Sequence, residues 1–181
     1  MALDDEKAGA TQEMCRTADW LRDCPDLAGV DSITLDALTS GSVHFSLPAG
    51  ALLFEAGSDP DGVYLVASGR LGVKTQGKTA LSAEIERGEL VGETGWLLKQ
   101  QRSATVVALR DCELLLIPNP VMDSITAQST QFSLALARLC ARRLRHSNRQ
   151  DYKPKRARVF AVVPNSLAVD VAHFPSQIVT N

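Results

Sequence analysis

The stretch from residue 45 to residue 73 reads FSLPAGALLFEAGSDPDGVYLVASGRLGV, and its pattern is the main indication of the fold. Short apolar runs at 52–54 and 63–66 alternate with turns rich in glycine, proline and aspartate. Many short strands at such spacing are typical of a β-sandwich or barrel. The glycines at 50, 57 and 69 suit tight turns, because glycine adopts positive φ angles without a steric penalty.

The same character continues to residue 117. Further strands are predicted from the alternation of Leu81, Ala83 and Ile85, and from the apolar runs at 105–109 and 114–117. Gly72–Thr79 satisfies the P-loop pattern, but a P-loop needs a strand before its first glycine and a helix from Gly-Lys-Thr. Gly72 lies inside an alternating strand, so this segment is predicted to be a strand followed by a hairpin turn.

Helical patterns flank the strands on both sides. A first helix is predicted with Thr11 or Thr17 as its cap, and a second, short helix with Asp31 or Ser32 as its cap and its end at Gly41. Residues 119–149 return to helical periodicity, with a predicted apolar stripe composed of Phe132, Ala135, Leu136, Leu139 and Leu144. The predicted fold class is therefore α+β, mainly β.

Residues 91–104 read VGETGWLLKQQRSA and carry the candidate chemistry. The pair Gly92-Glu93 should open one short helical turn, whose free N–H groups attract an anion. Arg102 adds a charged planar fork that suits phosphate oxygens. A carboxylate cannot bind phosphate, so Glu93 suits a sugar hydroxyl; the alternative is an ordinary solvated Gly-Glu and Arg-Ser pair.

Segments 45–73 and 91–104 together resemble the β-roll and the phosphate-binding cassette of cyclic-nucleotide-binding domains. The resemblance covers about residues 20–150 and implies a jelly-roll-like β-roll flanked by N-terminal and C-terminal helices. It implies Arg102 on the phosphate, Glu93 on the ribose 2′-hydroxyl, and cAMP in preference to cGMP as the regulatory ligand. The implied ligand-binding residues are Val73, Leu81, Val91, Gly92, Glu93, Thr94, Arg102, Ser103 and Ala104.

The resemblance extends to the helices after the roll, which in that family carry a lid over the base and often a dimer interface. Here Leu139, Arg142 and Arg143 would be the lid residues, and a homodimer through the C-terminal helix is one option. The alternative for this arginine-rich segment is a solvated helix face.

Bulk properties exclude several classes. A formal net charge of −2 on 181 residues gives no electrostatic reason to expect a nucleic-acid partner. The longest apolar runs are too short to span a membrane, and the acidic N-terminus lacks the apolar core of a signal peptide, so the cytoplasm is predicted. The cysteines at 15, 24, 112 and 140 and the three histidines match no metal-ligand spacing, so neither a metal nor a cofactor is expected.

The last segment suggests a longer protein. Residues 151–156 look like a polar linker, and RVFAVVPNS at 158–166 reads as a buried parallel strand for which no neighbouring strands follow. The predicted organisation is an N-terminal extension (1–18), a binding domain with flanking helices (19–150), and a linker with the truncated start of an α/β domain (151–181). The alternative is a stray strand on a stand-alone module.

A cyclic-nucleotide-binding domain followed by such a strand is similar to bacterial relatives of neuropathy target esterase, which are patatin-like phospholipases. The resemblance implies that this chain regulates a hydrolase attached in cis and has no catalytic residues of its own, since neither a Gly-x-Ser-x-Gly turn nor a glycine-rich oxyanion loop occurs. The full-length protein would be cytoplasmic, with peripheral membrane association as an option. Two other functions stay open: a nucleotide-independent interaction module, and the effector domain of a transcription regulator without its DNA-binding part.

Overall fold

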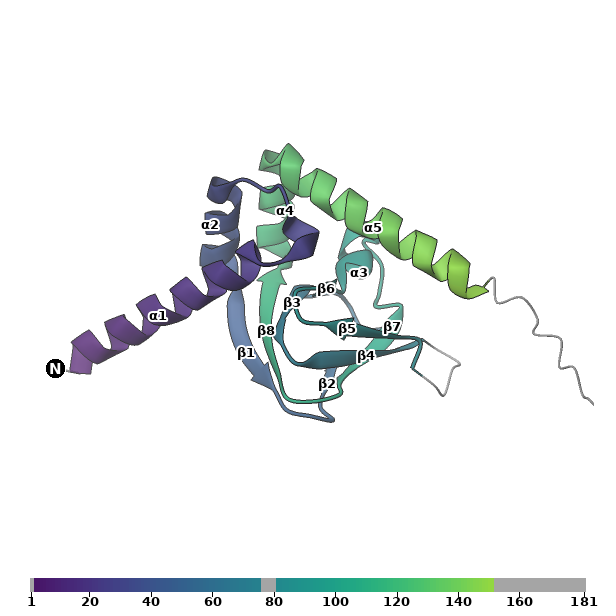
Figure 1. Ribbon diagram of the computed structural model, residues 1–181, viewed down its shortest axis with the longest axis horizontal. Coiled ribbons are helices and arrows are strands. Elements are labelled where there is room, and N and C mark those ends of the chain that lie inside the picture. The colour runs from purple at the N-terminus through teal and green to yellow at the C-terminus, as the bar shows by residue number, and fades with distance from the viewer. Residues whose placement is uncertain (1, 76–80, 152–181) are drawn as a thin grey trace, which may run out of the picture.

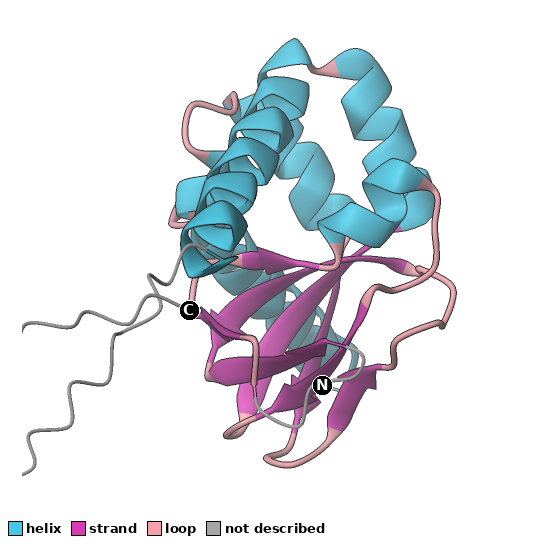
Figure 2. Cartoon of the chain, turned by 90° about the vertical axis from the view of Figure 1, so that its right-hand side faces the viewer, coloured by secondary structure: helices cyan, strands magenta, loops and turns pink. Residues whose placement is uncertain are grey.

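The computed structural model describes residues 2–75 and 81–151 of the chain, and side chains from 12 to 75 and from 81 to 145. It consists of a β-roll with helices gathered against one side (Figures 1 and 2). In chain order the elements are α1 (Ala2–Arg22), the 3-10 helix η1 (Pro25–Leu27), α2 (Ser32–Gly41), β1 (Val43–Leu47), β2 (Leu52–Phe54), β3 (Gly62–Ser68), β4 (Arg70–Thr75), β5 (Ala83–Glu86), β6 (Leu90–Val91), α3 (Glu93–Leu98), β7 (Ala104–Ala108), β8 (Cys112–Pro118), α4 (Asn119–Gln128) and α5 (Thr130–Asp151). The predicted β-roll flanked by helices is confirmed.

The strands form two antiparallel four-stranded sheets. Their orders are β1-β8-β3-β6 and β2-β7-β4-β5. Gly72 lies in the middle of β4, which pairs with β5 on one side and β7 on the other. Residues 72–75 of the P-loop pattern are therefore part of a strand, as predicted, while residues 76–80, where the hairpin turn was predicted, lie outside the described residues.

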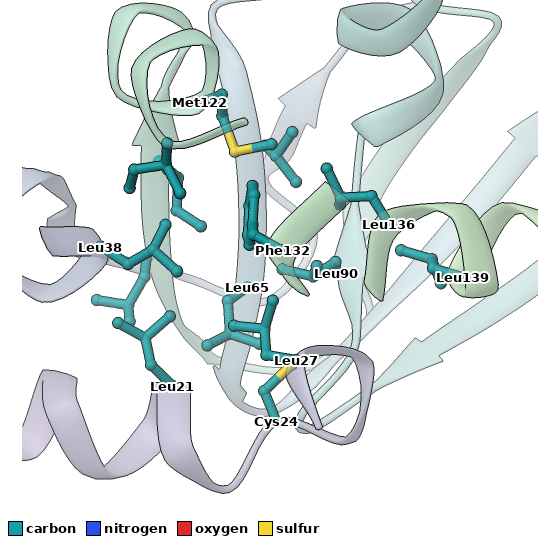
Figure 3. Packing of buried hydrophobic residues seen from close by; sticks show 14 of the residues in the cluster. Leu21, Cys24, Leu27, Leu38, Leu65, Leu90, Met122, Phe132, Leu136 and Leu139 are labelled. Atoms are coloured by element: carbon teal, nitrogen blue, oxygen red, sulfur yellow. The ribbon is translucent and has the colours of Figure 1, made fainter. Parts of the chain in front are cut away.

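Two hydrophobic cores explain why β3 reads as a continuous apolar run. Val63 and Leu65 belong to a core between the first sheet and the helices, while Tyr64 and Val66 belong to a core between the two sheets. Successive side chains of a strand point to opposite faces, so a strand buried on both faces needs apolar residues at every position. Figure 3 shows the first core, where Leu65 of β3 lies among residues from the surrounding helices, including Leu21, Leu38 and Phe132.

Of the two predicted helix starts in the N-terminal region, the structure agrees with one. The predicted cap of α2 is confirmed: Asp31 Oδ1 accepts from Thr34 N at 2.9 Å, and this bond lowers the pKa of the Asp31 carboxyl. The predicted start of the first helix near Thr11 or Thr17 is wrong, since α1 begins at Ala2. The segment before Thr11 consists mostly of good helix formers such as alanine, glutamate and lysine, which extend the helix toward the N-terminus.

The C-terminal helical region is divided into α4 and α5 at Ser129. Phe132, Leu136 and Leu139 are buried as predicted, whereas Leu144 is 64% exposed. The difference arises because Leu144 lies on the outward face of α5, together with Leu134, which is 48% exposed near the beginning of this helix (Figure 1).

The predicted boundary between residues 18 and 19 falls inside α1, and the tail after Asp151 lies outside the described residues. Within the described part of the chain, every helix is too short or too polar to cross a membrane.

Candidate functional site

The cassette, residues 91–104, begins where β6 passes into α3. Gly92 stands between them with φ of 87°, a left-handed conformation that favours glycine. A Cβ at this position would lie 2.3 Å from Arg102 Nη1, so the close approach of the guanidinium also requires glycine. The six-residue helix α3 ends at Leu98, and its C-cap residue Lys99 has a φ of 51°.

Arg102 is held rigidly beside this turn. Its side chain is buried, with Nη1 donating to Gly92 O at 2.8 Å and Nη2 donating to Gly62 O at 2.9 Å. Nη2 also donates to Asp61 Oδ1 at 2.6 Å, which forms an ion pair. A buried guanidinium needs such partners, because an unpaired buried charge is strongly destabilising.

Two aromatic rings complete the surroundings of Arg102. Its guanidinium carbon lies 4.2 Å from the ring centroid of Phe54 and 5.7 Å from that of Tyr64, both within cation–π range. The Tyr64 hydroxyl donates to Asp61 Oδ2 at 2.5 Å. Burial raises the pKa of Tyr64, and the Asp61 carboxylate raises it further, so the phenol keeps the proton that it donates.

Glu93, the first residue of α3, is 2% exposed and lies at the other side of the turn. Its Oε1 accepts from Thr94 Oγ1 at 3.0 Å and from Arg143 Nη1 at 2.5 Å. Glu93 Oε2 and Arg102 Nε are both buried without a hydrogen-bond partner. Buried polar atoms are normally paired, so these two atoms mark a place where a polar ligand would supply the missing bonds.

The other predicted cassette residues lie nearby. Ser103 is exposed, and Ala104 is half-buried at the start of β7. The backbone on either side is fixed, because Arg102 N donates to Ser58 O and Arg102 O accepts from Gly57 N, both at 2.8 Å.

The residues predicted to pack on the sugar and base differ in exposure. Val91 is buried in the core between the sheets, and Val73 is half-buried against the same core. Leu81 is 39% exposed and precedes β5 rather than lying within it. Its side chain lies over Gly72, at which an added Cβ would come within 2.8 Å of Leu81 Cδ2.

The three predicted lid residues occupy different places. Leu139 is buried in the core between the first sheet and the helices (Figure 3). Arg142 pairs with Asp26 of η1, while Arg143 pairs with Glu93. Of the three, the structure brings Arg143 into direct contact with the cassette.

Sequence reasoning missed the partners on the far side of α3. Asp123 of α4 accepts from Trp96 Nε1 at 3.1 Å and from Lys99 Nζ at 2.8 Å. The bond from Lys99 lowers the pKa of the Asp123 carboxyl. No sequence signal pointed to this contact or to Asp61, which lies in a loop with several turn-forming residues and was interpreted as one of them.

Two hollows lie away from the cassette. One, of about 310 Å³, lies between the end of α1 and the turn before β6, and the other, of about 420 Å³, lies between α2 and the junction of α4 with α5. Neither is lined by a residue of segment 91–104. The buried atoms without partners, rather than these hollows, mark the candidate site.

Comparisons with known proteins agree with this fold. Residues 44–129 match the family model of the cyclic nucleotide-binding domain. Catabolite activator protein of Thermus thermophilus is 31% identical with a TM-score of 0.63, and the match covers 70% of this chain and 61% of that one. The regulatory domain of Toxoplasma gondii PKA with cAMP shares the fold at 18% identity, with a TM-score of 0.67 and coverage of 75% and 52%.

Curated relatives add a second family name. An uncharacterized NTE family protein of Mycobacterium tuberculosis H37Rv is 35% identical over 150 residues, which are 83% of this chain and 25% of that protein. Lysophospholipase nte1 of Aspergillus oryzae is 33% identical over 100 residues, which are 54% of this chain and 6% of that protein. This chain thus spans a quarter or less of the length of these two relatives.

The fold and the cassette define the class: residues 44–129 are a domain of the cyclic nucleotide-binding family. The chain that carries this domain is related to the NTE family proteins.

Proposed function

We propose that the chain is a regulatory module that binds a cyclic nucleotide, cAMP in preference to cGMP, at the cassette. The observation that carries the proposal is the pair of buried, oppositely charged groups Arg102 and Glu93, each with one polar atom that lacks a partner. A cyclic nucleotide offers a phosphate anion for the arginine and a ribose hydroxyl for the carboxylate.

Each cassette residue then has a physical role. Arg102 neutralises the phosphate, and the backbone N–H groups of Gly92, Ser103 and Ala104 supply further donors. Glu93 accepts from the ribose 2′-hydroxyl through its free oxygen Oε2. Thr94 assists because its hydroxyl holds the other carboxylate oxygen at 3.0 Å.

The apolar part of the ligand needs contacts of another kind. Val73, Leu81 and Val91 would pack on the sugar and base, and the 39% exposure of Leu81 leaves it open to a base. The related fold with cAMP in Toxoplasma gondii PKA supports this class of ligand.

We infer further that the module controls a patatin-like lipid hydrolase attached in cis and has no activity of its own. The relatedness to NTE family proteins and to a lysophospholipase supports this role. Ligand binding would favour one position of α5, which leads toward the rest of the protein. A regulatory half of this kind belongs in the cytoplasm, where cyclic nucleotides are found, with the whole enzyme at the membrane surface as a peripheral protein.

Isothermal titration of the full chain with cAMP and with cGMP tests the ligand. Arg102→Ala should weaken binding by ~2–5 kcal/mol, because it removes the charge partner of a desolvated phosphate. Arg110→Ala is the matched control, since Arg110 is an exposed arginine in the turn after β7. Absence of binding to folded wild-type protein would refute the proposal.

One observation favours a second function, a nucleotide-independent interaction module of the same fold. Asp61 already supplies a carboxylate to Arg102 at 2.6 Å, so a phosphate has to share or displace this partner. If titration shows no binding of either nucleotide while the fold is intact, this second function replaces the first.

A homodimer through α5 is also part of the proposal. Leu134, Ala137, Ala141 and Leu144 are exposed at heptad spacing along one face of the helix, the pattern of a coiled-coil seam. Light scattering with size-exclusion chromatography should give a dimer mass that Leu144→Glu converts to a monomer mass. A monomeric wild-type chain at high concentration would rule this contact out.

A further inference from the structure

The positive charge of the chain is concentrated in one block at its C-terminal side. Residues 1–137 contain 10 lysines and arginines against 19 aspartates and glutamates, which gives a formal charge of −9. Residues 138–158, the basic block, contain 9 lysines and arginines against one aspartate, which gives +8. With Asp170 these two parts make up the net charge of −2, so the small net value does not reveal that the chain is divided into an acidic and a basic part.

The described part of the basic block lies on α5. Arg138, Arg142 and Arg145 recur at i, i+4 and i+7, the spacing that places residues on one side of a helix. Arg138 and Arg145 are exposed, and Arg142 is half-buried. Among the side chains that the structure describes, the ion pairs of α5 are those of Arg142 and Arg143. Arg138 and Arg145 therefore present their charges to the solvent.

The sequence continues the basic block after Arg145. The further basic residues are Arg149, Lys153, Lys155, Arg156 and Arg158. Arg149 still belongs to α5 and follows Arg138 by eleven positions, so it continues the same helical spacing. A cluster of roughly four to eight lysines and arginines is typical of segments that bind anionic lipid headgroups.

The arrangement of the helices separates the two kinds of charge. α5 begins against the other helices and runs outward, and its C-terminal end lies on the opposite side of the β-roll from the start of α1 (Figure 1). Asp4, Asp5 and Glu6 belong to the first turns of α1. A negatively charged surface repels an acidic part of the chain and attracts a basic one, so it would favour the orientation in which the end of α5 faces it.

The choice of a lipid surface over other polyanions rests on the proposed function, because a lipid hydrolase attached after α5 has to meet its substrate in a membrane. The anionic lipids of the cytoplasmic leaflet attract basic segments that lie near the surface. Arg138 and Arg145 directly follow Ala137 and Leu144 of the proposed dimer seam. They lie at the rim of that seam, so they remain accessible if α5 dimerises.

We propose that the basic block binds the surface of a membrane that contains anionic phospholipids. Electrostatic attraction holds Arg138, Arg145 and the basic residues that follow them at the headgroups, while the acidic part of the chain faces away. The nucleotide cassette takes no part in this contact. The chain thus has two separate interactions, one with a small ligand and one with a membrane surface.

Co-sedimentation of the full chain with vesicles tests the proposal. The chain should bind vesicles of phosphatidylcholine and phosphatidylserine in equal parts, and it should not bind vesicles of phosphatidylcholine alone. Binding should be lost in ~1 M salt, where the Debye length falls to ~3 Å. Each basic residue near an anionic surface contributes about fivefold to the affinity, so Arg138→Gln/Arg145→Gln should bind ~10- to 30-fold more weakly.

A second variant and a matched control keep the test specific. Lys155→Gln/Arg156→Gln alters the basic block outside α5 and should weaken binding to a similar degree. Lys74→Gln/Arg110→Gln removes the same charge from exposed positions of the β-roll and should bind as wild type does. Equal weakening by the control and the block variants would show that net charge determines binding, and it would overturn the proposal.

Three other results would also overturn the proposal: wild-type binding by both block variants, equal binding to the two vesicle compositions, and binding to a DNA duplex without binding to the anionic vesicles. Titration with cyclic nucleotides separates this inference from the proposed function. If the chain binds anionic vesicles but neither nucleotide, the proposed ligand is wrong and the membrane contact stands. If it binds a nucleotide but not the vesicles, the proposed ligand stands and the membrane contact is wrong.

Discussion

Replacement of Gly92 by alanine separates two reasons for a glycine in the cassette. An alanine with φ of 87° is strained by ~1–2 kcal/mol, the cost of a left-handed conformation for a residue with a Cβ. Its Cβ would also stand 2.3 Å from Arg102 Nη1, so the guanidinium has to move away from Gly92 O. The displaced bond involves a buried charged group and is worth a further ~1.5–3 kcal/mol.

Gly50 provides the control for this variant. Its φ is 81°, and nothing lies within 4 Å of an added Cβ, so Gly50→Ala carries the backbone strain without the collision. We expect urea unfolding to show a loss of stability larger for Gly92→Ala than for Gly50→Ala by ~1.5–3 kcal/mol. Titration should show cAMP affinity ~10- to 100-fold weaker for Gly92→Ala and unchanged for Gly50→Ala. Equal stability and equal affinity of the two variants would refute the idea that Gly92 exists to admit the guanidinium.

Three further changes test neighbouring features. Asp61→Asn removes the anion that competes for Arg102 and should tighten cAMP binding by ~2- to 5-fold, as expected for a partly exposed ion pair, whereas weaker binding in titration would contradict competition. Asp123→Ala removes the contact of α4 with the cassette helix and should speed hydrogen exchange in α3, while unchanged exchange would show that the contact does not hold the helix. Burial raises the pKa of the Cys24 thiol from 9.0 to about 12, so the unfolded chain loses this proton first. The contribution of this thiol to the free energy of unfolding should be complete below pH 9 and should fall between pH 9 and 12 by up to ~1.4 kcal/mol per pH unit. Urea unfolding of Cys24→Ser at the same pH values should lack this decrease.

The sequence was sufficient to predict the strands of the roll and the turn that opens the cassette. A run such as Val63–Val66 has to be buried on both faces, and the two cores of the roll supply one face each. Gly92, Glu93 and Arg102 are brought together because the short helix α3 and the loop that follows it fill the interval between them. Local spacing encodes these features, so a pattern can predict them.

The ion pairs around the cassette were not predictable in this way. Arg102 and Asp61 are 41 residues apart, Arg143 and Glu93 are 50 apart, and Arg142 and Asp26 are 116 apart. Such pairs depend on the angle at which elements cross, and no local periodicity records that angle. The sequence therefore suggested the arginines of α5 as lid residues or as a solvated helix face, and it gave no sign of the carboxylates of η1 and α3 that they contact.

The cassette helix α3 is the place where these long-range contacts converge. A helix of six residues is far below the length at which helices are stable in isolation, so tertiary contacts fix its position. Those contacts come from Asp123 of α4, from Arg143 of α5, and from Arg102 through the carbonyl of Gly92. A ligand that bonds Arg102 and Glu93 changes the contacts on two sides of α3 at once, while the β-roll below has two cores that resist movement. The position of the C-terminal helices is therefore the coordinate through which occupancy of the cassette would be transmitted to whatever follows α5.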